Sequence, residues 1–240
     1  MVGMIFAAGL GTRLKPLTDT MPKALVPLAG KPLLQWQVEK LRDAGITDII
    51  VNVHHFPDMI IDAIRANNGW GCSITVSDER DCLLDTGGGL KKAVTGYGLQ
   101  VTGEPILACN VDILSNIDIR ALIAAYSDSL LVVSERETQR YLCFDANDRL
   151  CGWTNRKTGE LKGRDGRQLA FSGMQILSPE TLTRLGQMPQ DKFSLIDFYL
   201  QVMNEVSLKA YVPADYRMMD VGKIDQIEQA EAFAKMLYNI

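Results

Sequence analysis

Short apolar segments alternate with helix-like segments through the first half of the chain, and this order constrains the fold more than any other feature. Strand-like runs cover Met4 to Ala8, Thr47 to Val53, Cys72 to Val76 and Pro105 to Asn110. Helical patterns cover 32–45, 57–66, the residues after the glycines at 87–89, and 117–126. Such alternation predicts a mostly parallel sheet with helices packed on it.

The second half has a different texture. Turn-rich sequence such as TGELKGRDG joins strand-like segments at 129–134, 140–144, 150–154 and 169–177. Helices are expected over 179–185, 194–204 and 224–237, with a strand near 209–212. We therefore expect an α/β fold: a Rossmann-like, mixed, mostly parallel sheet flanked by helices, with a smaller inserted antiparallel lobe. Residues 1–240 are interpreted as one domain, with lobes over 1–127 and 128–222 and a C-terminal helix over 223–240.

Composition excludes several classes of protein. The chain has 25 Lys+Arg against 29 Asp+Glu, a net charge of -4, and so lacks the broad basic face of nucleic-acid binders. No apolar run is long enough to span a bilayer, and the first apolar stretch lacks the basic leader of a signal peptide. Five scattered cysteines without a CxxC pair favour reduced thiols in the cytoplasm over a zinc site. We expect no nucleic-acid or membrane partner, and both a monomer and a dimer stay open.

A glycine-rich segment, AAGLGTR at 7–13, follows the first predicted strand. Glycines at this place let backbone N–H groups approach a polyphosphate, Arg13 can fork onto phosphate oxygens, and Lys23 adds a point charge. The segment is neither a Walker A loop nor a GxGxxG motif. Taken alone, the GxG pattern is better explained by a glycine turn with two surface cations.

The longer pattern that contains this segment resembles the signature of the sugar nucleotidyltransferases, GxGTRLxPLT…PKxLxPxxGKP. Every fixed position of that pattern is filled between Gly9 and Pro32. The resemblance implies a Mg²⁺-dependent transfer of a nucleotidyl group from a nucleoside triphosphate to a sugar-1-phosphate, with release of pyrophosphate. It implies catalytic roles for Arg13 and Lys23. It also implies nucleotide contacts at these two residues and at Ala8, Gly9, Gly11 and Thr12.

A second glycine motif, LDTGGG at 84–89, opens a predicted helix. Its N–H groups are expected to be unsatisfied and able to receive a ligand, whereas the plainer interpretation is a tight turn with Thr86 as N-cap. The motif resembles the loop of the family that contacts base and ribose, in the LETGGG form of the N-acetylmuramic acid-1-phosphate uridylyltransferases. Asp85 replaces the glutamate of that form. The resemblance implies nucleotide contacts at Asp85, Thr86, Gly87 and Gly88.

Two aspartates are candidate ligands of a magnesium ion. Asp112 follows a predicted central strand, and ligands of open α/β sheets bind outside the carboxyl ends of the strands. Carboxylates are ligands that suit Mg²⁺. The residues around Asp112 resemble the NGD element of the family, and those around Asp220 resemble its WxDVG element. Val111 and Met218 depart from these patterns. The resemblance implies that both aspartates hold the metal and that Asn110 contacts the nucleotide.

The sugar side carries fewer signals. Gly173 lies in a segment that resembles the FSGI element of the family, whose glycine backbone lies against the sugar phosphate. The EKP motif of the family is missing, and Asn155 or Arg156 stands in its place, with a structural turn as the alternative. His54 and His55 are adjacent, so on a strand they point to opposite faces and make a poor metal pair.

The resemblance to the N-acetylmuramic acid-1-phosphate uridylyltransferases implies UTP and N-acetylmuramic acid-1-phosphate, or a similar hexosamine phosphate, as the substrates. GTP with mannose-1-phosphate, CTP with phosphocholine, and a non-catalytic regulatory role remain as alternatives. A glycosyltransferase is disfavoured because residues 110–112 read NVD where a DxD metal motif is expected. A sugar-1-phosphate is mostly dianionic at neutral pH, since its second pKa is about 6, so no general base is required.

Overall fold

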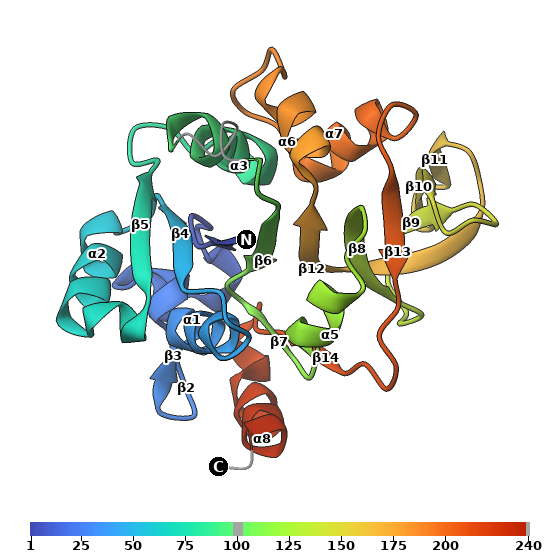
Figure 1. Cartoon of the computed structure of the whole chain (residues 1–240). Helices are drawn as coiled ribbons and strands as arrows, with labels where there is room; N and C mark the ends of the chain where they lie inside the picture. Colours follow the sequence, from blue (N-terminus) through green and yellow to red (C-terminus); the bar gives the residue numbers. More distant parts are fainter. Residues whose placement is uncertain (98–102, 239–240) are drawn as a thin grey trace. The chain divides into compact units, whose positions relative to one another are not determined.

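The computed structural model describes residues 1–97 and 103–238, and it confirms the expected α/β fold (Figure 1). A mixed, mostly parallel central sheet is flanked by helices. The chain forms two compact units. The first unit comprises Met1–Leu83, Ala108–Arg120 and Arg217–Ile240, and the second comprises Leu84–Leu107 and Ala121–Tyr216. The functional division into 1–127, 128–222 and 223–240 stays a prediction.

Parallel strands form the centre of the first unit. They are β1 (Val2–Phe6), β4 (Asp48–Val53) and β5 (Ser73–Asp78), with β4 between the other two. Helix α1 (Leu33–Asp43) contacts β1, and α2 (Pro57–Ala66) contacts β5. Five of the six residues of β4 are buried, which explains the near-continuous apolar sequence of this strand.

Short elements complete the first unit. They are the hairpin β2 (Pro27–Leu28) and β3 (Lys31–Pro32), the antiparallel ribbon β7 (Ile113–Ser115) and β14 (Met218–Asp220), the 3₁₀ turns η1 (Thr12–Leu14), η2 (Leu17–Asp19), η3 (Lys23–Leu25), η4 (Asn68–Gly71) and η5 (Ile224–Gln226), and helix α8 (Ile227–Tyr238). The ribbon and the hairpin were not expected, because strands of two or three residues have no readable periodicity. Tyr238 of α8 stacks on Trp36 of α1 with ring centroids 4.4 Å apart.

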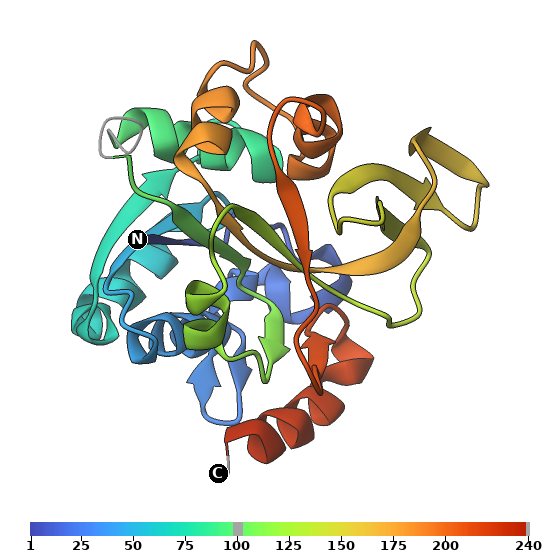
Figure 2. The ribbon, with the colours of Figure 1, turned by 45° about the vertical axis from the view of Figure 1, so that its right-hand side comes forward.

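The second unit is built on antiparallel strands. They are β8 (Ser129–Ser134), β9 (Arg140–Phe144), β10 (Leu150–Asn155), β11 (Glu160–Gly163) and β12 (Arg167–Leu177), with β13 (Leu208–Tyr211) parallel to β8. The long strand β12 pairs with β9 at its start and with β8 farther along (Figure 2). The helices are α3 (Asp85–Gly96), α6 (Pro179–Gly186) and α7 (Leu195–Val202). The boundaries between the two units along the chain fall within strand β6 (Ile106–Asn110) and within helix α5 (Ile119–Ala124).

Two expectations about this region need correction. The turn-rich sequence after β10 contains a strand, β11, which pairs with β10 from Gly152 to Asn155. Strand β12 begins at Arg167, two residues earlier than expected. Both differences arise because exposed polar residues can join a ladder when a neighbouring strand offers partners, which local sequence does not reveal. In the described part of the chain, all helices are too short or too polar to cross a membrane.

Candidate active site

The glycine-rich loop leaves the end of β1 and turns at Gly11. The φ of Gly11 is 64°, a conformation that favours glycine. A Cβ added there would lie 2.8 Å from the Thr18 methyl carbon, so the loop is also packed too tightly for a larger residue. Gly9 differs, since among the described residues nothing lies within 4 Å of its Cβ position. The loop is therefore fixed at Gly11 and open at Gly9, with Ala8 buried and Thr12 exposed.

Buried polar side chains hold the start of this loop. The amide N–H of Ala7 donates to Oδ1 of Asn52 (2.8 Å), and Nδ2 of Asn52 donates to Oε1 of Glu79 (2.7 Å). His54 hydrogen-bonds the Glu79 carbonyl oxygen at 2.7 Å, and His55 hydrogen-bonds the Thr18 carbonyl oxygen at 3.2 Å. The two histidines thus follow the end of β4 and hydrogen-bond backbone carbonyls. The described residues contain no cluster of three or more metal-binding side chains. Sequence reasoning missed Asn52 and Glu79; the one available signal was an asparagine inside the apolar run IIVNV.

Lys23 and Asp112 meet in an ion pair within the first unit. Both side chains are largely withdrawn from solvent, and Lys23 also donates a hydrogen bond to Oδ2 of Asp112. Asp112 stands between β6 and β7, at the carboxyl end of β6. The structure therefore brings together one cation and one carboxylate that the sequence assigned to different roles.

Asp220 lies next to Asp112 through the backbone. In the ribbon, Asp220 is paired with Ile113, and the N–H of Val221 donates to the Asp112 carbonyl oxygen at 2.9 Å. The guanidinium of Arg13 is 3.9 Å from the Asp220 carboxylate. A Cβ on Gly222 would lie 2.7 Å from Oδ1 of Asp220 and 3.0 Å from the Arg13 guanidinium. Glycine at 222 thus leaves the space in which these two charged groups meet.

This arrangement fits a magnesium ion. Mg²⁺ in nucleotide sites is commonly held by one or two carboxylates and by substrate phosphate oxygens. Asp112 directly precedes β7, and Asp220 ends β14 opposite Ile113, so the backbone brings the two residues close; each carboxylate has a cation beside it. The metal role of both residues stays a prediction that the geometry of the ribbon supports.

The glycine triplet of the second unit does not have the free N–H groups that we expected. The N–H groups of Gly87 and Gly88 both donate to the carbonyl oxygen of Phe193, at 2.9 and 3.2 Å. That part of the argument is wrong, because tertiary contacts satisfy these donors. Thr86 is not the N-cap either: helix α3 has Leu84 at that position, without a side-chain cap. Asp85 has a φ of 63°, which aspartate tolerates better than most residues.

The nucleotide role of residues 85–88 stays a prediction, and so does that of Asn110, which ends β6 and is half-buried. Asn155 ends β10, and its Oδ1 accepts from the Lys157 N–H at 3.0 Å, as in a turn. Gly173 has a φ of 71° and lies in an irregularity of the β8–β12 ladder between Phe171 and Gln175. The structure thus gives Asn155 a local structural contact and gives Gly173 a reason to be glycine; their sugar-phosphate roles stay predictions.

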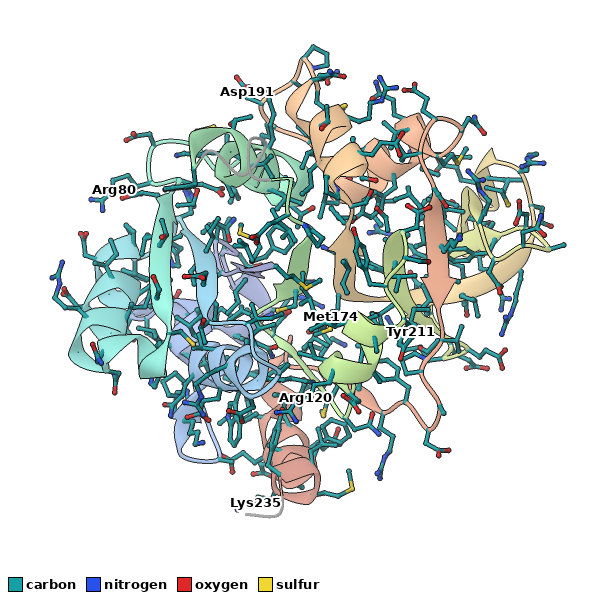
Figure 3. The ribbon with its side chains drawn as sticks, viewed as in Figure 1. Arg80, Arg120, Met174, Asp191, Tyr211 and Lys235 are labelled. Carbon is teal, nitrogen blue, oxygen red and sulfur yellow. The ribbon has the colours of Figure 1, made fainter. Side chains whose placement is uncertain are left out.

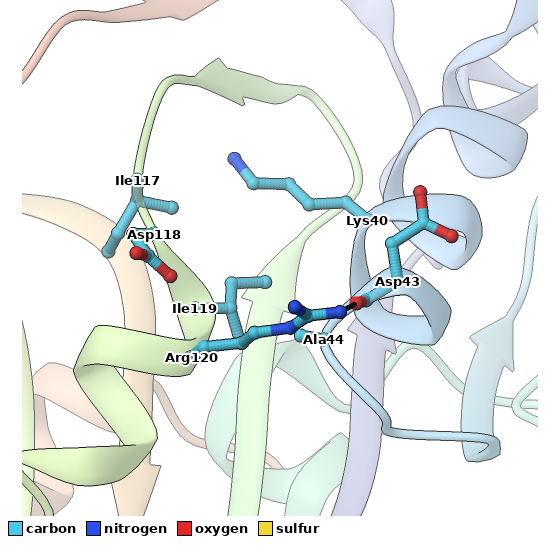
Figure 4. Close-up of a pocket in the computed structure, with 7 residues that line it drawn as sticks. All are labelled: Lys40, Asp43, Ala44, Ile117, Asp118, Ile119 and Arg120. Atoms are coloured by element: carbon cyan, nitrogen blue, oxygen red, sulfur yellow. Dashed lines mark hydrogen bonds between the residues drawn. The ribbon is translucent and has the colours of Figure 1, made fainter.

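A hollow of about 300 Å³ in the first unit is lined by none of the predicted site residues (Figure 4). Lys40 reaches into it from α1, and its Nζ donates to the carbonyl oxygen (2.6 Å) and hydroxyl (2.8 Å) of Ser115. Burial lowers the pKa of Lys40 from 10.5 to about 8. Arg120 closes one side by donating to the Asp43 carbonyl oxygen.

Known proteins resemble this chain over most of its length. A family model described as nucleotidyl transferase matches residues 2–138. The chain is 31% identical over 240 residues to the N-acetylmuramate alpha-1-phosphate uridylyltransferase of Neisseria meningitidis serogroup B, with 98% of each chain covered. The protein of the same name from Caulobacter vibrioides is 33% identical over 213 residues, with 82% of each chain covered.

Among solved structures, HddC from Yersinia pseudotuberculosis complexed with GMP-PN is similar, with a TM-score of 0.75 and 27% identity over 98% of this chain and 100% of that one. The chain described here belongs to the nucleotidyl transferase family. The family expected from the glycine-rich signature is thereby confirmed, together with the enzyme class of nucleotidyltransferases.

Proposed function

We propose that the protein transfers a uridylyl group from UTP to N-acetylmuramic acid-1-phosphate, or a close hexosamine phosphate, and releases pyrophosphate. One observation carries the chemistry: the backbone brings Asp112 and Asp220 to neighbouring positions, and each carboxylate lies beside a cation, Lys23 or Arg13. Two acids and two cations suit a reaction that only has to position and neutralise phosphates.

The reaction needs no general base from the protein. A phosphate oxygen of the sugar-1-phosphate attacks the α-phosphorus of the nucleotide, the bond to the β-phosphate oxygen breaks, and pyrophosphate leaves. Asp112 and Asp220 would hold Mg²⁺, which supplies neutralising charge to the phosphates when bound.

The two cations have different settings. Lys23 is buried and held by Asp112, so it is a fixed charge that needs little reorganisation. Arg13 is exposed, with 61% of its side chain accessible, and is free to close onto phosphate oxygens. We infer that Lys23 neutralises charge near the α-phosphate and that Arg13 binds the outer phosphates.

Uracil is preferred over guanine for two reasons. The LDTGGG segment is closest to the LETGGG form, and both of the relatives described above are uridylyltransferases by name. Guanine is the second candidate, because HddC, a structural relative, was solved with GMP-PN. We place the reaction in the cytoplasm, in keeping with the five free cysteines.

A pyrophosphate-release assay tests the proposal. Four nucleoside triphosphates are screened against N-acetylmuramic acid-1-phosphate, other hexosamine phosphates, mannose-1-phosphate and phosphocholine, with the Asp112→Asn/Asp220→Asn variant as a control for contaminating enzymes. We expect the highest kcat/KM with UTP and a hexosamine phosphate. Related sugars should also react, because one hydroxyl or methylene shifts discrimination by only about 1–3 kcal/mol. A clear GTP preference would overturn the base assignment, and no release with any pair would favour a non-catalytic role.

A further inference from the structure

The 190–195 segment, which joins α6 to α7, is docked on the turn that begins α3. Its sequence, QDKFSL, contains no recognised binding motif. All of its contacts described below lie within the second unit. Asp191, labelled in Figure 3, belongs to this segment.

Backbone groups of the segment and of the turn bond in both directions. The N–H of Phe193 donates to the Leu84 carbonyl oxygen at 3.3 Å. The carbonyl oxygen of Phe193 in turn accepts from Gly87 (2.9 Å) and Gly88 (3.2 Å). A residue far along the chain therefore takes the place of a ligand at the two donors that the glycine motif exposes.

The side-chain contacts explain why glycines stand there. A Cβ on Gly87 would lie 2.4 Å from the Phe193 ring, and a Cβ on Gly88 would lie 2.0 Å from the Asp191 carbonyl oxygen. The hydroxyl of Thr86 accepts from the Leu195 N–H at 3.0 Å. The spacing of the motif is thus matched to the segment that covers it.

Lys91 fastens the other end of the segment. It lies one helical turn after Gly87 on α3, and only 17% of its side chain is exposed. Its Nζ donates to the Gln190 carbonyl oxygen (3.0 Å) and to Oδ1 of Asp191 (2.8 Å). The hydrogen bond and charge of Lys91 lower the pKa of Asp191. Because Asp191 is exposed, this pair contributes little to overall stability, and its main effect is on where the segment lies.

We propose that the 190–195 segment sets the geometry of the turn at 84–88, and that Lys91 is a positioning residue that holds it there. The inference rests on the proposed function for one point, that residues 84–88 contact the nucleotide base. Under this proposal, base selection depends on the 190–195 segment, although that segment has no nucleotide-binding motif. A shift of Phe193 would move Gly87 and Gly88, to which it is hydrogen-bonded, and so change the groups that face the base.

Lys91→Met tests this inference, with Lys192→Met as the matched control. Lys192 is an exposed lysine of the same segment, so the control removes the same charge. In Lys91→Met we expect the KM for the preferred nucleotide to rise at least about fivefold and the UTP:GTP ratio of kcat/KM to change at least about threefold. The kcat and the KM for the sugar phosphate should stay within about twofold. Lys91→Arg, which keeps the charge and donors, should restore most of the nucleotide KM.

Amide hydrogen exchange measured without substrates provides a second readout. Exchange at 86–89 should accelerate in Lys91→Met and stay unchanged in Lys192→Met; wild-type exchange in Lys91→Met would overturn the inference whatever the substrates are. Faster exchange together with an unchanged nucleotide KM and an unchanged UTP:GTP ratio of kcat/KM would show that the segment is only a structural contact. That result would also overturn the inference. If the wild type releases pyrophosphate with no pair of nucleotide and sugar phosphate, the proposed function fails. The inference is then tested by the Kd values for Mg²⁺-UTP and Mg²⁺-GTP. Unchanged Kd values in Lys91→Met overturn the inference, and weaker or altered binding supports it.

Discussion

Lys23 and Asp112 form an ion pair in which 10% and 19% of the two side chains are exposed. The carboxylate that we assign to the metal therefore already has a fixed cation beside it. Removal of one partner of such a buried pair destabilises the folded protein, because the remaining charge is then poorly solvated and uncompensated. Lys23 consequently holds the predicted metal ligand in position.

Removal of either aspartate should abolish metal-dependent catalysis. We expect Asp112→Asn and Asp220→Asn each to lower kcat at least about 100-fold, because each removes a carboxylate from the predicted magnesium site. Steady-state assays across a Mg²⁺ titration measure this, with Asp225→Asn in the exposed turn η5 as the control. Full wild-type activity in excess chelator would rule out the metal assignment.

Arg13→Ala should weaken catalysis far more than folding. Arg13 is exposed, and its contact with Asp220 is 3.9 Å long, so it contributes at most about 1 kcal/mol to stability. We expect kcat/KM to fall at least about 100-fold and the Tm to change little. Lys15→Ala is the matched control, since Lys15 is equally exposed in the same loop but pairs with Asp19. An early-melting Arg13→Ala variant with normal kcat/KM would show that Arg13 is structural.

Gly88→Ala should destabilise the protein, although alanine normally favours a helix. The new Cβ would overlap the Asp191 carbonyl oxygen at 2.0 Å, and relief requires movement of the backbone. We expect a loss of about 1–3 kcal/mol in the free energy of unfolding. Gly96→Ala in the same helix meets nothing within 4 Å among the described residues and should be neutral or slightly stabilising. Denaturant unfolding compares the two, and equal stabilities would contradict the described packing.

Lys40 should make the free energy of unfolding depend on pH above about pH 8. Its pKa is lowered from 10.5 to about 8 by burial, so between these pH values the unfolded state binds a proton that the folded state has released. Stability from this group therefore rises with pH across that window, by up to about 1.4 kcal/mol per pH unit. We expect the free energy of unfolding of the wild type to rise relative to Lys40→Met between about pH 8 and about pH 10. Lys235→Met, at an exposed position of α8, should show no such difference, and parallel curves for wild type and Lys40→Met would refute the assignment.

Local sequence predicted the elements that have strong local signals. The helix over 57–66 begins at a proline and has an apolar stripe, and α2 has these same bounds. The ribbon of β7 and β14 was not predicted, since neither strand has more than three residues. That ribbon, rather than any local pattern, places Asp220 beside Asp112.

For the glycine motifs, sequence and structure contributed different things. Gly11 could be predicted as a turn residue, and its positive φ explains why. The donors of Gly87 and Gly88 could not be placed, because their partner, Phe193, lies more than a hundred residues away along the chain. Buried N–H groups are nearly always satisfied, but which carbonyl satisfies them depends on the tertiary fold.

The sequence by itself determined the family, the α/β class and the candidate residues, because these depend on residue identities and on short-range periodicity. The tertiary structure decided which charges meet: Lys23 with Asp112, Arg13 with Asp220, and Lys91 with Asp191. The physical reason is that Coulomb and hydrogen-bond energies depend on distances between atoms, and the chain's folding sets these distances between residues that are remote in sequence.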